Sequence, residues 1–320
     1  GRLLYDYNNK YLLSATVRRE GSSEFGPNNK YAVFPSFSAG WNLDKENFLS
    51  FLFAEKNGLN TLKFRGSWGQ NGNDQFARRF AYMSTVNSTD KTYHFGTGDE
   101  TLLVGSSPDQ LANRDIKWET SEQLDLGFDA VLFNNFTLTF DYYDKKTKDW
   151  LVLASIPTYA GATAPYINGG DVNNKGFEIG LGYRTHIGKD WNFGINANLS
   201  RNQNKVLRIA NNEGIIHGET NVLFQGLDEM NRVEVGKPMG YFYGLKTDGI
   251  FQNAAEVAAG VQPNAQPGDV RFVDLNNDGK IDANDKTEVG NPNPDINYGV
   301  NLEVSYKAFD FSINTYGIAG

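Results

Sequence analysis

The stretch QLDLGFDAVL, residues 123–132, alternates between apolar and polar or glycine positions over most of its length. Leu124 and Leu126 fall on one register, whereas Asp125 and Asp129 fall on the other. Because successive side chains of a β-strand point to opposite faces, this period of two predicts a strand with one apolar and one polar face. Charges in the middle of the second face indicate that this face meets water.

The same alternation recurs along the chain. Further strands of this kind are expected around residues 11–18, 137–142, 177–184, 191–200 and 298–306. The segments 116–133 and 173–187 alternate for longer than the usual five or six residues of a globular strand, and a bilayer-spanning strand needs roughly nine to eleven. With about ten such strands, the pattern predicts an all-β, antiparallel transmembrane barrel or part of one.

Short and long connections alternate between these strands. Short turns are expected at residues 8–9, 134–135, 188–190 and 307–308, and long polar loops at 20–30, 73–115, 145–172 and 202–295. Outer-membrane barrels have short periplasmic turns and long extracellular loops, whereas a sandwich has no reason for this asymmetry. Residues 44–57 are the exception on the short-turn side. There we expect Asp44 to cap a brief helix over residues 48–52, which Gly58 ends.

The composition argues against several classes of protein. The 320 residues carry a formal charge of −8, which disfavours nucleic-acid binding because phosphate contacts need clustered Lys and Arg. The absence of cysteine excludes disulfides and thiolate metal sites, and three scattered histidines argue against zinc. No apolar run is long enough for a transmembrane helix. The chain begins at Gly1 and ends at Gly320 inside a strand-like segment, so we interpret it as a piece of a larger protein.

No group of residues predicts catalysis. Ser, His and Asp occur without an arrangement that suggests a triad. Carboxylate pairs such as Asp141 and Asp144 are expected to be solvated. We therefore do not expect an enzyme.

Residues 274–285, DLNNDGKIDAND, have the spacing of a calcium loop, with glycine at loop position 6. The expected ligands are Asp274, Asn276, Asp278, the carbonyl of Lys280, Asp282 and Asp285. The last position is Asp rather than the Glu of an EF-hand, and no amphipathic helix flanks the loop. We therefore expect a structural Ca²⁺ that staples a loop of a β protein. A polar turn without metal is the alternative.

Aromatic residues fall into two groups. In the long loops they are candidate substrate contacts, because rings can stack on flat sugar faces, although they could equally pack the loops together; this group is Tyr93, Phe95, Tyr159, Tyr166, Phe224, Tyr241 and Tyr243. At the strand ends they predict interfacial girdles, although aromatics are also common in strands; this group is Tyr5, Tyr7, Tyr11, Trp41, Trp68, Trp118, Trp150, Trp191, Tyr306 and Phe309.

Charged residues on the polar register would face a lumen, where they line a path or simply supply polarity; these are Arg18, Lys63, Arg65, Glu178, Arg184 and Glu303. If the apolar register faces lipid, Arg should be costly at Phe128 and tolerated at Asp129.

Six segments resemble one known family: GRLLYDYNNKYLLSATVRREGSSEFG at 1–26, FPSFSAGW at 34–41, LKFRGSWGQNGN at 62–73, WETSEQLDLG at 118–127, NNKGFE at 173–178 and GNPNP at 290–294. The order and spread of these segments resemble the SusC-like (RagA-like) TonB-dependent outer-membrane transporters of Bacteroidetes. The resemblance implies the C-terminal portion of a 22-stranded barrel, without the N-terminal plug, the TonB-contacting segment and the last strands.

The resemblance also implies a function. Members of the family are multi-pass outer-membrane proteins that import oligosaccharides or peptides with energy from the inner membrane, and a SusD-like surface lipoprotein caps the barrel. The calcium-type loop also resembles a loop common in the family. The substrate is not implied, because the specificity loops vary most. The competing interpretations are a secreted calcium-dependent carbohydrate-binding β-sandwich module and a small passive barrel.

Overall fold

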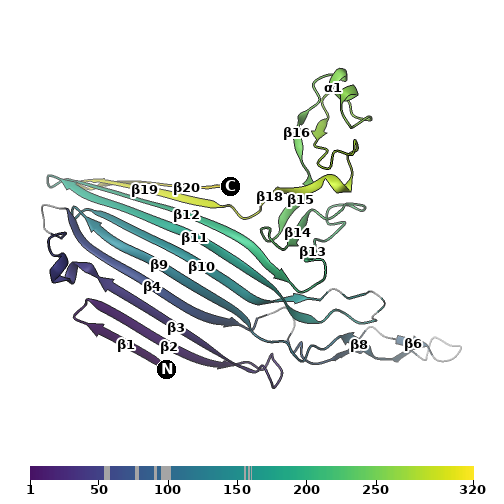
Figure 1. The fold of residues 1–320 in the computed structure, drawn as a ribbon, viewed down its shortest axis with the longest axis horizontal. Helices are drawn as coiled ribbons and strands as arrows, with labels where there is room; N and C mark the ends of the chain where they lie inside the picture. Colours follow the sequence, from purple (N-terminus) through teal and green to yellow (C-terminus); the bar gives the residue numbers. More distant parts are fainter. Residues whose placement is uncertain are drawn as a thin grey trace.

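Ten long antiparallel strands form one curved sheet in the computed structural model (Figure 1). Each strand pairs with its neighbours along the chain, and β1 and β20 lie at the two edges. The strands are β1 Arg2–Tyr7, β2 Tyr11–Gly21, β3 Tyr31–Asn42, β4 Leu59–Asn73, β9 Glu119–Leu132, β10 Phe136–Leu153, β11 Tyr166–Ile187, β12 Trp191–Ile209, β19 Ile296–Tyr306 and β20 Phe309–Ala319. The structure describes residues 1–53, 58–75, 79–89, 92–94, 102–154, 156–157, 159 and 161–320.

One face of this sheet is apolar, as the rows of residues that lie side by side on neighbouring strands show. A single row runs across nine strands through Tyr7, Tyr11, Trp41, Phe64, Phe128, Phe140, Ile179, Leu199 and Tyr298. Neighbouring rings in the row touch, as Phe128 does with Phe64 and Phe140 at centroid distances of 6.1 and 5.7 Å. Many of these side chains are exposed in the isolated sheet. No second sheet packs on this face within the described residues, so the β-sandwich alternative is not supported.

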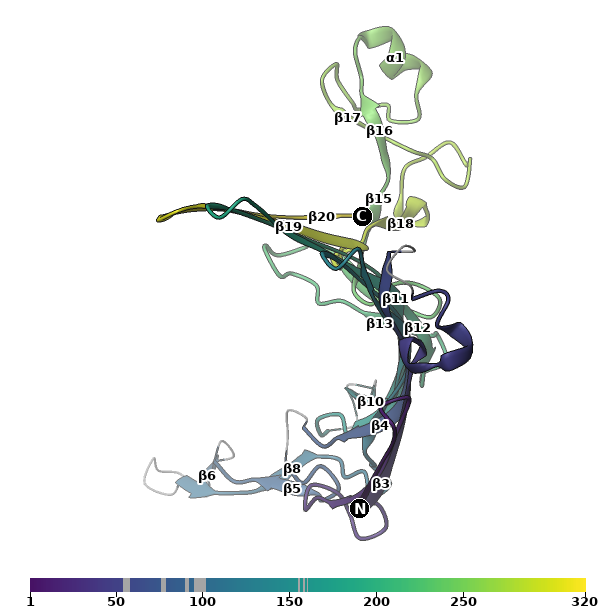
Figure 2. The same cartoon turned by 90° about the vertical axis from the view of Figure 1, so that its left-hand side faces the viewer.

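The opposite face is polar. A parallel row passes through Lys63, Asp129, Thr139, Gly180 and Asn198. The two rows differ by one residue on every strand, as the alternation predicts. Figure 2 shows the sheet edge-on as an arc with a concave and a convex side.

The short turns lie together at one end of the strands (Figure 1). They are tight because asparagine, lysine or glycine takes a left-handed conformation in each, with φ of 53° at Asn8, 61° at Asn134, 63° at Gly188 and 53° at Lys307. All four expected turns are thereby confirmed. The expected helix of 48–52 is wrong in detail, because the chain forms two 3₁₀ turns, η1 Leu43–Lys45 and η2 Asn47–Leu49, and Asp44 does not cap them.

Two of the expected long loops are shorter than the sequence indicated. Strand β10 continues to Leu153 and β11 begins at Tyr166, so the loop is 154–165 rather than 145–172. Strand β12 continues to Ile209, so the loop region is 210–295 rather than 202–295. Backbone pairing continues where the apolar alternation stops, with irregular register beside Trp150. Alternation marks only the part of a strand that separates two different solvents, which explains the error.

The long connections carry small elements at the opposite end. Residues 74–118 contain β5 Thr85–Asn87, β6 Thr92–His94, β7 Leu102–Val104 and β8 Ser107–Gln110. Residues 210–295 contain β13 Ile215–His217, β14 Asn231–Glu234, β15 Tyr241–Leu245, β16 Thr247–Ile250, α1 Ala254–Ala259, β17 Val270–Phe272, η5 Ala283–Asp285 and β18 Lys286–Gly290. None of the described helices is long and apolar enough to cross a membrane.

A compact apolar cluster ties the loops 22–30 and 74–118 to the sheet. It contains Phe25, Phe34, Ala81, Ile116, Trp118 and Leu151. Trp118 is buried here, and its Nε1 donates to the carbonyl oxygen of Asn29 at 3.1 Å. Trp118 is therefore not a girdle residue, and the prediction that it faces the membrane interface is wrong.

Candidate functional site

The polar face of the sheet is the concave one. The 43–53 segment lies on the convex side in Figure 2, and its Glu46 accepts a hydrogen bond from the Trp41 indole at 3.2 Å. Trp41 belongs to the apolar row, so the apolar register faces outward and the polar register faces inward. The convex side carries an almost wholly apolar groove, which is lined by residues that include Leu13, Phe37, Trp68 and Leu126.

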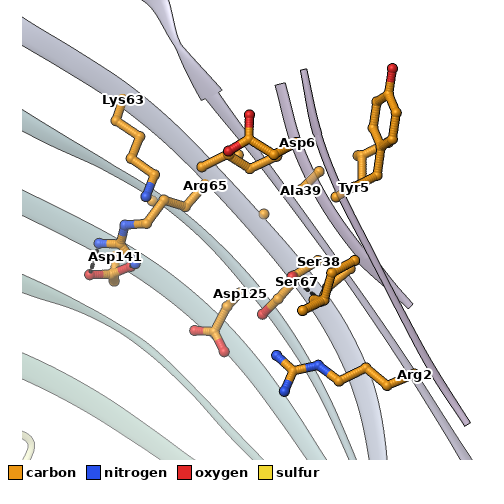
Figure 3. A pocket seen from close by; sticks show the side chains of 17 residues that line it. Arg2, Tyr5, Asp6, Ser38, Ala39, Lys63, Arg65, Ser67, Asp125 and Asp141 are labelled. Atoms are coloured by element: carbon orange, nitrogen blue, oxygen red, sulfur yellow. Dashed lines mark hydrogen bonds and ion pairs between the residues drawn. The ribbon is translucent and has the colours of Figure 1, made fainter. Parts of the chain in front are cut away.

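A groove on the concave side is lined by strands β1 to β4, β9 and β10 (Figure 3). Its charged residues come from four strands: Arg2 and Asp6, Lys63 and Arg65, Asp125, and Asp141. Serine hydroxyls of Ser14, Ser38 and Ser67 supply the rest of its polar wall. Such a surface binds polar groups and water, as the wall of a wet lumen must.

Among the residues that line this groove, Arg65 binds two carboxylates at once. Its guanidinium is bidentate to Asp129, at 2.8 and 3.0 Å, and also reaches both oxygens of Asp141, at 2.8 and 2.9 Å. Bidentate pairs of this kind fix the geometry more tightly than single ion pairs. In Figure 3 Lys63 extends toward the same cluster. Two carboxylates around one guanidinium leave a net negative cluster, with the Lys63 ammonium beside it.

Gly127 makes possible this arrangement of Arg65 with Asp129 and Asp141, which we call the Arg65 clasp. It lies between Arg65 and Asp141 in the hydrogen-bonded row. A Cβ at Gly127 would come within 2.2 Å of Asp141 Oδ1 and 2.5 Å of the Phe140 carbonyl oxygen. The arginine can therefore reach across a whole strand only because this position has no side chain.

A chain of amides continues the polar face toward the long loops. The Tyr143 hydroxyl donates to Asn202, which lies beside Asn174. Asn204 donates to Asn174 at 2.8 Å and accepts from the main-chain N–H of Met239 at 2.7 Å. The network thus joins the sheet wall to the loop region 210–295. A polar lining and a loop anchor are made from the same residues.

The other predicted inward charges lie on the same face. Glu178 lines a groove with Asn196 and Asn198, and Arg184 and Glu303 line another nearer the short turns. Arg18 forms an ion pair with Glu20 near the long-loop end. None of these shares the bidentate geometry of Arg65 within the described residues.

The loop aromatics do not form one surface. Tyr93 and Phe224 are exposed, Tyr159 is 90% exposed, and Tyr166 packs against the apolar cluster. Phe95 lies outside the described residues. The structure therefore does not gather these rings into a single stacking site in the part of the chain that it describes.

Tyr241 and Tyr243 belong to the four-stranded sheet of β13, β14, β15 and β18. Tyr241 is only 2% exposed and donates its hydroxyl to Glu234, so its ring has no face free for a sugar. Burial and this carboxylate raise the pKa of Tyr241. One face of Tyr243 is covered by the Arg232 guanidinium, 3.4 Å from the ring centroid.

Arg232 is part of a charged cluster on this small sheet. Its Nε donates to Glu229 at 2.7 Å, and His217 Nδ1 lies 2.9 Å from the same carboxylate. Glu213 lies 3.2 Å from His217 Nε2. The hydrogen bond to Glu229 and then that to Glu213 raise the pKa of His217. Sequence spacing gave no signal for this cluster.

The calcium-type loop is closed by its own backbone. Asp274 accepts from the N–H groups of Asp278 and Gly279 at 3.2 and 2.8 Å. Asp285 is fully buried and accepts from Leu275 and Asp282 at 2.9 and 2.8 Å. These bonds, first that from Asp282, lower the pKa of Asp285.

The loop is a partial match to a cation site. Its donors are all oxygen, which suits Ca²⁺. However, no group of three or more carboxylate or imidazole side chains comes together as a metal site within the described residues, which include the whole loop. Its donor chemistry therefore fits calcium, and its carboxylates would have to draw together around the ion.

The chain matches the family model described as TonB dependent receptor-like, beta-barrel, over residues 1–314. It is 36% identical to TonB-dependent receptor P3 of Formosa agariphila over 98% of this chain and 30% of that protein. It is 29% identical to TonB-dependent receptor SusC of Bacteroides thetaiotaomicron, again over 98% of this chain and 30% of that protein.

A solved structure of the RagAB peptide transporter has the same fold, with a TM-score of 0.78 at 22% identity over 98% of this chain and 32% of that one. The chain thus spans about a third of the length of the relatives and structures that it matches. With its ten-stranded sheet of two unlike faces, the chain belongs to the TonB-dependent receptor-like β-barrel family of the outer membrane.

Proposed function

We propose that this chain is the wall of a TonB-dependent importer that carries a nutrient across the outer membrane. The family match over residues 1–314 is the observation that carries the proposal. The concave polar face supports it, because a wet lumen needs such a lining. The ten strands do not close on each other, since β1 and β20 remain sheet edges, so a small passive barrel made from these strands alone is not supported.

The test is uptake in the source bacterium with and without the gene. Cells receive a mixture of oligosaccharides and peptides, and mass spectrometry follows the loss of each compound from the medium. At least one compound should disappear only when the gene is present and the inner membrane is energised. Uptake that persists with an uncoupler would indicate a passive pore. Identical uptake by both strains would contradict import.

The substrate is proposed to be an oligosaccharide or a peptide. The charged groove around Arg65 and the amides of Asn174 and Asn204 would suit either, because both substrates carry many hydrogen-bonding groups. The exposed rings of Tyr93, Tyr159 and Phe224 could stack on sugars. The uptake mixture separates the two classes directly.

The proposed partners are TonB, acting through a part of the protein outside this chain, and a SusD-like surface lipoprotein over the long loops. Residues 253–268 are a suitable deletion, because main-chain hydrogen bonds from Phe251 to Asp269 and from Gly268 to Phe251 close the base of this loop. The deletion should weaken co-purification of the lipoprotein from the intact transporter. Replacing the opposite turn, 188–190, is the control. Undiminished co-purification after deletion would place the contact elsewhere.

We also propose that residues 274–285 bind one structural Ca²⁺. Asp274, Asn276, Asp278, Asp282 and Asp285 would supply side-chain oxygens and Lys280 its carbonyl. Protein purified without chelator should contain about one equivalent of calcium by elemental analysis. Asp278→Asn with Asp282→Asn should lose it. Metal-free protein with an ordered loop would make this segment a plain turn.

A further inference from the structure

The connection between β3 and β4 is unusual for the short-turn end, because it forms an insertion that leaves the strand axis. Residues 43–53 form the turns η1 and η2 and lie on the convex side of the sheet (Figure 2). The other turns at this end contain only a few residues. A periplasmic connection of minimal length would not need this excursion.

Glu46 fixes the insertion to the outer face. It is 6% exposed, and it accepts from the Tyr11 hydroxyl at 2.6 Å, the Trp41 indole at 3.2 Å and the Lys10 ammonium at 3.3 Å. The hydrogen bond from Tyr11 is the main reason that the pKa of Glu46 is lowered. A buried carboxylate with three donors, one each from β2, β3 and the turn between β1 and β2, holds one conformation. Leu43, on the same segment, is also buried.

The far side of the insertion is apolar and exposed. Phe48 is 66%, Phe51 63% and Leu52 38% exposed. Phe133, in the next turn, is also exposed and donates its N–H to Gly58 at the end of the insertion. A patch of exposed apolar side chains of this kind on a water-facing surface would promote aggregation.

The surroundings of the patch point to a lipid surface. The rings of Tyr7, Tyr11 and Trp41 stack in sequence beside it, with centroids 6.3 and 6.4 Å apart. Such amphipathic rings belong at the boundary between headgroups and acyl chains. The patch lies on the same convex side as the apolar groove, the side that faces lipid in an outer-membrane protein of this family.

We propose that residues 47–52 form an interfacial wedge that inserts Phe48, Phe51 and Leu52 among the phospholipids of the periplasmic leaflet. Glu46 and its three donors set the depth of the wedge relative to the strands. This short, exposed apolar segment at the end of a strand adds an in-plane anchor of the kind that amphipathic helices supply elsewhere. The inference rests on the outer-membrane location and not on the proposed transport function.

The test measures the depth of residue 48 by spin labelling. The described chain has no cysteine, so Phe48→Cys can carry a single nitroxide once any cysteine elsewhere in the full-length protein is replaced. Leu126→Cys on the apolar face and Lys189→Cys in a short turn are the lipid and water references. The full-length protein is reconstituted in phosphatidylethanolamine–phosphatidylglycerol vesicles, and each variant is first shown to fold by heat-modifiable gel migration.

The label at residue 48 should behave like the one at 126, relaxed by oxygen and shielded from a water-soluble nickel chelate. A label with the accessibility of position 189 would overturn the proposal by placing the wedge in water. A label shielded from both reagents would also overturn it, because a second copy or another protein would then cover the patch. Either result leaves the uptake experiment unaffected.

Discussion

The sheet and the loop region 210–295 are both β structure, but they are stabilised differently. In the sheet, strands of up to 22 residues separate an apolar from a polar face, and few side chains are fully buried. In the loop region, strands of three to five residues surround isolated buried groups such as Tyr241, Phe251 and Asp285. The sheet depends on the difference between lipid and water, whereas the loop region depends on its own small core and on hydrogen bonds.

This difference predicts how each region responds to a misplaced charge. A charge on the lipid face is not solvated by water, and the stability that it costs depends on its depth in the bilayer. A charge on an exposed loop side chain remains solvated, so it changes little. The strongest tests therefore compare substitutions on the two faces of one strand.

The largest effect is expected at Phe140. Phe140→Arg places a guanidinium on the apolar row, where the native ring contacts the rings of Phe128 and Phe177. It should lower the free energy of unfolding by about 2–4 kcal/mol if the residue lies near the bilayer midplane. Thr139→Arg, the adjacent residue on the polar row, is the matched control and should change it by less than about 1 kcal/mol. Denaturant titration in lipid vesicles measures both.

Equal losses at these two positions would show that the faces are not different solvents. Asp129, which the sequence indicated as a tolerant position, is not a neutral control, because it accepts two hydrogen bonds from Arg65. In the loop region, Phe242→Arg provides the contrast, and this exposed position should tolerate the charge.

The next effect concerns the Arg65 clasp. Arg65→Gln leaves Asp129 and Asp141 facing each other without their shared cation. We expect a loss of about 1–2 kcal/mol, reduced by the partial exposure of all three groups. Lys63→Gln is the charge-matched control, since its ammonium makes no ion pair with the described residues. The same denaturant titration measures both variants. An equal loss of unfolding free energy for Lys63→Gln would mean that Arg65 contributes only the general polarity of the lumen wall.

A smaller effect is expected where the two regions join. Asn204→Ala removes the acceptor of the Met239 N–H and should loosen β14 and β15 with a loss of about 1 kcal/mol of local stability. Hydrogen exchange of residues 231–245 should increase while β10 and β11 stay protected. Asn198→Ala, on the same strand and face, should leave that exchange unchanged. Faster hydrogen exchange throughout the sheet would mean that the contact between Asn204 and Met239 does not act locally.

The smallest effect concerns pH in the loop region. Because Glu229 raises the pKa of His217 above its ordinary value of 6.5, the protonated form is favoured in the folded loop. The stabilisation is complete below about pH 6.5 and is lost as the pH rises through the folded pKa. Hydrogen exchange of residues 213–232, corrected for intrinsic rates, should therefore increase toward alkaline pH. His217→Asn should remove this dependence, and a dependence that survives it would assign the titration to another group.

The fold could be predicted from the sequence because each strand has one face toward lipid and one toward water. The resulting alternation of apolar and polar residues can be read along a single strand, without knowing which strands pair with it. The extensions of β10 to β12 lie beside the long loops and carry buried side chains such as Leu151 and Val206, so their pattern no longer follows the period of two. The long-range partners could not be predicted either. Glu46 meets Tyr11 across 35 positions and Arg65 meets Asp141 across 76, and nothing local to those residues indicates either pair.

The candidate site was predictable to a similar extent. Alternation placed Lys63, Arg65 and Glu178 on the inner face, and the register agrees. It could not show that Tyr241 is buried rather than available for stacking, because loop rings follow no period. Whether Asp274 and Asp285 hold calcium stays a prediction, because the loop can satisfy these carboxylates with its own N–H groups.

The central claim is that one register of each strand meets lipid and the other meets a wet lumen. The most direct measurement is a single-cysteine scan of residues 136–147 on β10 in intact outer membranes, with labelling rates for a membrane-impermeant maleimide. We predict a period of two, with Thr137, Thr139 and Asp141 labelled rapidly and Leu138, Phe140 and Tyr142 protected. Similar rates at adjacent positions along the strand would contradict the account.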